Sequence, residues 1–124
     1  MKAHRTRVLA LAILAISLPA LLHAQSFDEL RQRARRGDAA VQFELGARYS
    51  MGEEVVLNLS EAMKWYRRAA KGGDARAQYQ LGIGYADGML LRQSRTKAVK
   101  WLRRAAQQEN AAAQSVLKEM NENW

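Results

Sequence analysis

The stretch WYRRAAKGGDARAQYQLG (Trp65–Gly82) decides the fold, because the chain spells much of it twice. Thirty-six residues after Trp65 the sequence reads WLRRAAQQENAAAQSVL (Trp101–Leu117). Each copy places a tryptophan, an arginine pair and an alanine pair at the same offsets. Self-similarity at a period of this length indicates an architecture of stacked repeats.

The two copies extend well beyond the quoted stretch. Residues 37–72 and 73–108 align without a gap and share 15 identities across 36 positions. Average residue usage would give roughly two or three identities by chance. A single helical pair cannot bury its apolar face alone, so repetition lets one unit cover the next. The sequence therefore predicts two packed repeats, at 37–72 and 73–108.

Each repeat has the pattern of two helices. The segment AMKWYRRAA (62–70) carries one wide apolar stripe opposite a charged face, whereas AAVQFELGARY (39–49) is apolar almost all round. The second pattern is typical of an inner helix that is covered on several sides. A leading half-repeat helix at 25–36 and a trailing half-repeat helix and tail at 109–124 complete an all-α chain of about six helices.

Glycines inside the first helix of each repeat predict a close approach of helices. Gly46 and Gly82 occupy the same register, where glycine costs about 1 kcal/mol relative to alanine. We expect Trp65 and Trp101 to pack across these gaps. The residues predicted to form the structural core of the repeats are Leu45, Gly46, Tyr49, Trp65, Ala69, Leu81, Gly82, Tyr85, Trp101 and Ala105.

The first 24 residues have the layout of a secretory signal peptide. Three basic residues precede the apolar run Val8–Leu18, and Pro19 interrupts the run before it reaches the roughly 20 residues of a membrane span. We expect cleavage after Ala24 and a periplasmic location, with membrane contact only through this segment. An uncleaved anchor is the alternative.

Composition narrows the chemistry of the remaining chain. It has no cysteine, and both histidines lie in the predicted signal, so thiol or imidazole catalysis and transition-metal binding are not expected. We predict no catalytic, cofactor or metal site. Loss of the signal also lowers the net charge from +8 to about +5, which weakens the case for nucleic acid as a partner.

The pattern G-D-A-x-x-Q-[FY]-x-L-G-x-x-Y-x-x-G followed by A-x-K-W-x-R-R-A-A resembles the Sel-1-like repeat, a relative of the tetratricopeptide repeat. The resemblance covers Gly37 to about Met120 and implies a right-handed α-solenoid whose first helices line a concave, partner-binding surface. The chain departs from the family at Glu54 and Leu90, where a second loop glycine is usual. By that geometry, the residues expected to face the partner are Phe43, Ala47, Ser50, Arg76, Tyr79, Ile83 and Asp87.

The resemblance implies a non-enzymatic protein-binding module of the periplasm, acting as an adaptor, a regulator or an immunity-type binder with one dedicated partner. Phe43 and Tyr79 are either interface anchors or inter-helix packing residues. The alternative function is an accessory factor or enzyme of cell-envelope metabolism, which would need a carboxylate pair such as Glu44 with Glu53 or Asp87. The basic residues of the second helices form either a solvated face or an attractor for anionic partners.

Overall fold

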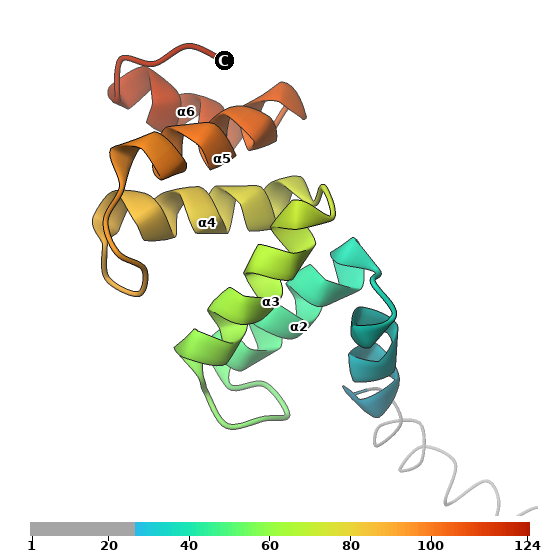
Figure 1. The fold of residues 1–124 in the computed structure, drawn as a ribbon. Helices are drawn as coiled ribbons and strands as arrows, with labels where there is room; N and C mark the ends of the chain where they lie inside the picture. Colours follow the sequence, from blue (N-terminus) through green and yellow to red (C-terminus); the bar gives the residue numbers. More distant parts are fainter. Residues whose placement is uncertain (1–26) are drawn as a thin grey trace, which may run out of the picture.

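The computed structural model describes residues 27–124, which form six helices and no strand (Figure 1). The first helix spans residues 27–35. The others are α2 (Ala39–Met51), α3 (Leu59–Lys71), α4 (Ala75–Asp87), α5 (Arg95–Gln107) and α6 (Ala111–Glu119). The predicted all-α solenoid is therefore confirmed. The predicted signal peptide, residues 1–24, lies outside the described residues.

Polar side chains fix where the helices begin, at positions that repeat along the chain. The first helices of successive units start behind Asp38, Asp74 and Asn110, whose side chains accept hydrogen bonds from the backbone N–H three residues later. Asn58 and Ser94 cap α3 and α5 in the same way. Each cap satisfies an N–H group that the helix itself leaves unpaired.

The helices stack in chain order. The α2 helix packs most extensively on α3, and α4 on α5, while α3 against α4 and α5 against α6 join one pair to the next. Figure 1 shows this succession from the helix at 27–35 to α6 at the other end. Among residues 27–124, no helix combines the length and apolar character that crossing a bilayer requires.

Apolar side chains gather at the joints between successive helices. Leu30 and Ala34 of the first helix meet Val41, Leu45 and Trp65 at the first joint. At the second joint, Ala69, Ala70, Ala77, Leu81 and Trp101 occupy the corresponding places. The third joint joins α5 to α6 through Val99, Leu102, Ala105, Ala106, Ala113 and Leu117. Trp65 and Trp101 therefore close one joint each, and the third joint has no tryptophan.

The glycines at 46 and 82 do mark close approaches, but the tryptophans do not fill them. A Cβ atom on Gly46 would lie 2.8 Å from the ring of Tyr66, and one on Gly82 would lie 2.6 Å from Leu102. These two residues directly follow Trp65 and Trp101 in the sequence, and they point toward α2 and α4. The expected packing of the tryptophans across the glycines was wrong, because the tryptophans face the neighbouring joint.

Candidate partner-binding face

The seven residues expected on the concave face come from α2 and α4, and a contact between Arg76 and Phe43 joins the two helices. The guanidinium carbon of Arg76 lies 4.2 Å from the ring centroid of Phe43. The Phe43 ring also lies against Tyr66, with ring centroids 5.3 Å apart. Phe43 is half-buried, whereas Arg76 is exposed. The aromatic ring therefore both packs within its repeat and supports an exposed cation of the next one.

The cation is held in this place by the cap of its own helix. Asp74 accepts hydrogen bonds from Nη2 of Arg76 at 2.8 Å and from Nε at 3.3 Å. Asp74 is almost fully buried, with 8% of its side chain exposed, while 55% of the Arg76 side chain is exposed. The hydrogen bond to Asp74 raises the pKa of Arg76 above its usual value. Arg76 is thus a fixed, permanently charged donor on the surface.

The rest of the α2 side of the face is less accessible. Ala47 and Ser50 are half-buried. The Ser50 hydroxyl donates to the carbonyl of Ala47 at 2.8 Å and lies 3.4 Å from the Tyr66 hydroxyl. Its hydrogen-bonding capacity is therefore largely used within the repeat, and this part of the face presents mainly small, weakly polar surface.

The α4 side differs between its middle and its C-terminal end. Tyr79 is half-buried and packs against the third joint, and Ile83 is also half-buried. Asp87 is exposed and accepts a hydrogen bond from the backbone N–H of Met89 at 2.9 Å, which shapes the loop that follows. Phe43 and Arg76 are therefore in contact, whereas Tyr79 belongs to the next joint and Asp87 to the loop.

The residues predicted as structural core lie where the helices meet. Tyr49 and Tyr85 are half-buried, and Tyr49 meets Phe27 edge-on with ring centroids 6.4 Å apart. The others are buried, namely Leu45, Gly46, Trp65, Ala69, Leu81, Gly82, Trp101 and Ala105.

Of the three acidic side chains considered for catalysis, Glu44 binds a cation and Asp87 binds the backbone. Arg48 binds Glu44 at 3.1 Å and Glu54 at 2.9 Å, which ties α2 to its following loop. Glu53 is exposed, and Asp87 accepts from the backbone as described. Within residues 27–124, no group of three or more His, Cys, Asp or Glu side chains has the arrangement of a metal site.

The second arginine of each repeated pair covers a tryptophan. Arg68 lies 4.7 Å from the ring centroid of Trp65, and Arg104 lies 4.8 Å from that of Trp101. A guanidinium over an indole face is favourable and also shields the ring from water. These two cations of the basic series therefore take part in packing the joints.

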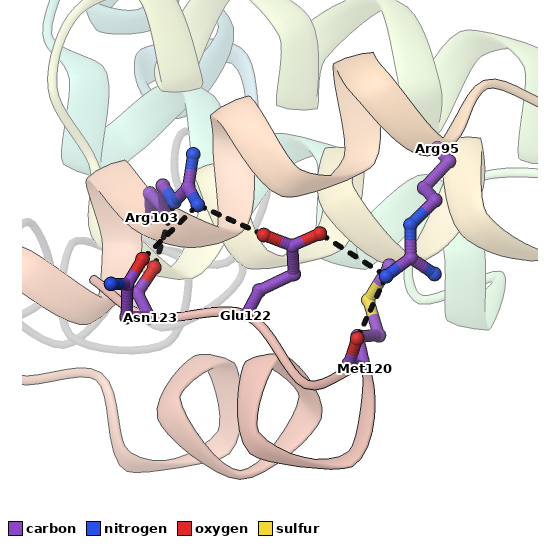
Figure 2. Close-up of polar contacts among 5 residues, drawn as sticks. All are labelled: Arg95, Arg103, Met120, Glu122 and Asn123. Carbon is purple, nitrogen blue, oxygen red and sulfur yellow. Dashed lines mark hydrogen bonds and ion pairs between the residues drawn. The ribbon is translucent and has the colours of Figure 1, made fainter.

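Sequence reasoning missed a cluster at the C-terminal end, where residues 120–123 lie against α5 (Figure 2). One carboxylate oxygen of Glu122 accepts from Arg95 at 3.1 Å and the other from Arg103 at 2.9 Å. Arg95 also donates to the Met120 carbonyl, and Arg103 to the Asn123 carbonyl, each at 2.7 Å. The only signal in the sequence was the absence of acidic residues from α5, against five cations.

Comparisons with known proteins agree with this geometry. A family model described as the Sel1 repeat matches residues 39–74 and 75–110, which together cover more than half of the chain. The chain therefore belongs to the Sel1-repeat family. Proteins of this family are generally protein-interaction modules, and their fold is typically a non-enzymatic binding scaffold.

Two solved structures show the same fold. A Sel1 repeat protein from Oxalobacter formigenes is 39% identical, with a TM-score of 0.71 over 75% of this chain and 70% of that one. A protective antigen of uropathogenic Escherichia coli strains, which displays an SLR fold, is 40% identical with a TM-score of 0.70. That match covers 76% of this chain but 20% of the antigen.

A curated relative is similar over a shorter stretch. The secretory immunoglobulin A-binding protein EsiB of Escherichia coli O6:H1 (strain CFT073) is 45% identical over 53 residues. The match covers 43% of this chain and 11% of EsiB. The matched stretch thus spans about a tenth of that relative.

Proposed function

We propose that this protein is a periplasmic protein-interaction module that binds one dedicated partner through the face formed by α2 and α4. The contact between Arg76 and Phe43 carries the proposal, because it joins the two repeats into one continuous surface with a fixed exposed cation. Arginine and aromatic residues are the types most often found at the centre of binding interfaces.

The size of the stack favours a single compact partner. A standard interface buries about 800 Å² on each side, which would occupy most of the inner face of two repeats. A knob or loop of one protein fits such a surface better than a long peptide does. The adaptor, regulatory and immunity-type roles all use a surface of this kind, and none requires catalysis by the module itself.

The binding activity of the relative EsiB supports a protein as the class of ligand. EsiB is described as an immunoglobulin A-binding protein. Because the match covers about a tenth of EsiB, we do not propose immunoglobulin as the partner of this protein. The periplasmic location rests on the predicted signal peptide, and sequencing the N-terminus of the exported protein should find Gln25 as its first residue.

Capture of the tagged protein from periplasmic extract of its own host tests the face. Arg76→Glu reverses an exposed charge and should reduce recovery of the dominant captured protein by roughly tenfold or more. Arg92→Glu, in the exposed loop after α4, is the matched control and should leave recovery unchanged. Equal recovery with both variants, or many captured proteins with no dominant one, would contradict the proposal.

A further inference from the structure

The surface of α5 between Arg95 and Arg103, called here its outer edge, binds a segment of its own chain. A peptide from another protein could make the same contacts. Arg95 and Arg103 donate to one carboxylate, two backbone carbonyls and the side-chain amide oxygen of Asn123, all from residues 120–123 (Figure 2). The carboxylate and the backbone carbonyls are groups found in any extended acidic peptide. We propose that this edge is a second docking surface, for an acidic segment of a partner protein, and that Glu122 occupies it in the free protein.

The register of the repeats shows which part of α5 this edge is. Met63 of α3 has the same register as Val99 of α5, and Met63 packs against the joint that contains Trp101 of the following repeat. The corresponding edge of α5, between Arg95 and Arg103, has no following second helix among the described residues. The segment 120–123 lies there instead, held by side chains that remain partly exposed.

Charge complementarity identifies the occupant. The α5 helix carries five cations and no acidic residue, and the acid that the structure places between Arg95 and Arg103 is Glu122. A hollow of about 330 Å³ beside that carboxylate is lined by Arg95, Thr96, Val99, Lys100, Arg103 and Glu122. Further carboxylates of a longer peptide would meet Lys100 there, next to the apolar surface of Val99.

The contacts favour a peptide over an anionic lipid or polymer. Two of the arginine hydrogen bonds go to backbone carbonyls of Met120 and Asn123, acceptors that a phosphate headgroup does not reproduce at the same spacing. The pair of arginines is present in repeat two but not in repeat one. In repeat one, Arg67 occupies the position of Arg103, but Leu59 occupies the position of Arg95. The α3 edge therefore has one of the two arginines.

The segment is held weakly enough to be displaced. Side-chain exposure is 61% for Arg95, 40% for Arg103 and 27% for Glu122, and solvent-exposed ion pairs contribute little to stability. A partner segment with several carboxylates would compete with one glutamate that is tethered nearby. The free protein would then exchange its own contact for an intermolecular one of the same chemistry.

Binding of a dye-labelled decapeptide of alternating Glu and Asn residues, measured by fluorescence anisotropy, tests the proposal. Glu122→Gln removes the internal competitor and should bind the peptide roughly three- to tenfold more tightly than the unaltered protein. Arg95→Ala with Arg103→Ala should abolish that binding. Arg67→Ala, which alters the equivalent position of repeat one, is the control and should bind like the unaltered protein.

Several outcomes would overturn the proposal. The first is equal peptide binding by the Glu122→Gln variant and the unaltered protein, which does not depend on whether the arginine variants fold. The second is equal binding of a decapeptide with Gln in place of Glu. Binding to phosphatidylglycerol vesicles without peptide binding would assign the edge to a membrane, and peptide-independent dimerisation would assign it to a second copy. The α2–α4 face is unaltered in all of these variants. Its proposed role is tested independently, by the capture experiment with Arg76→Glu.

Discussion

The side-chain amide of Gln78 donates a hydrogen bond to the carbonyl of Ala70 at 3.2 Å, across the turn that joins one repeat to the next. Gln42 makes the same bond to Ala34 at 2.9 Å, and Gln114 makes it to Ala106 at 3.1 Å. Gln78 and Gln42 are the two polar side chains among the buried residues of the described chain. The recurring glutamine therefore fastens the start of each first helix to the end of the helix before it.

Replacing Gln78 with Met should lower the free energy of unfolding by about 1–2 kcal/mol, because the change keeps most of the volume and removes a buried hydrogen bond. It also removes an acceptor for the Gln108 amide, which lies 2.9 Å away. Chemical denaturation measures the loss. Gln107→Met, at an exposed position, is the control and should change stability by no more than about 0.5 kcal/mol. Equal effects at both positions would show that the bond contributes nothing.

Gly46→Ala should destabilise the protein by about 1–3 kcal/mol, although alanine is the better helix former. The added methyl group would lie 2.8 Å from the Tyr66 ring and 3.2 Å from the carbonyl oxygen of Ala62. Gly84→Ala is the matched comparison. Its methyl group would meet the flexible ends of Met63 and Leu91 at 3.0 and 3.2 Å, so the cost should be smaller. Thermal melts that rank the two variants in the opposite order would contradict this account of the close approach.

Trp101→Ala should cost about 3–5 kcal/mol, the range for truncating a buried aromatic side chain. The tryptophan closes the second joint between Ala69, Ala70, Ala77 and Leu81, and 8% of it is exposed. A melt followed by circular dichroism measures the change. Trp124→Ala, at a residue that is 51% exposed, should melt within a degree or two of the unaltered protein. The same small shift for Trp101→Ala would remove this tryptophan from the core.

Glu109→Gly should stabilise the protein by roughly 0.5–1 kcal/mol. Glu109 has a φ of 65°, and the equivalent positions of the two full repeats are Gly37 and Gly73, with φ of 102° and 97°. Glycine adopts this left-handed conformation without the steric conflict that a Cβ atom causes. Glu109→Ala keeps the Cβ atom and is the control, which should not stabilise. A Glu109→Gly variant that melts at or below the original temperature would contradict the prediction.

The fold could be predicted because it depends on features that recur in the sequence. A period of 36 residues, cap residues such as Asp74 and the apolar stripe around Trp65 all repeat, and each repetition supports the others. The side chain that packs against each of Gly46 and Gly82 was harder to predict. Trp65 and Tyr66 are adjacent, so both lie on the broad apolar side of α3, and the crossing of α3 over α2 decides which of them meets Gly46.

The two candidate surfaces differ in how much the sequence reveals. The α2–α4 face follows from the register of the repeats, but register alone did not show that Arg76 would lie on Phe43. The edge of α5 could not be predicted from any motif. Its contacts join Arg95 and Arg103 to residues 120–123, which follow α6, whereas the equivalent residues of the full repeats, 48–51 and 84–87, are the helical ends of α2 and α4. Such contacts depend on the path of the chain after α6.

The missing tryptophan of the third joint has a consequence for local unfolding. The nine-residue helix α6 is packed chiefly on α5, whereas α4 lies between α3 and α5. In a stack whose units contact only their neighbours, opening begins where the fewest interfaces must be broken. Backbone amides of α6 should therefore exchange with solvent deuterium earlier than those of α4. Any partner that holds α6 against α5 would slow that exchange from the C-terminal end inward.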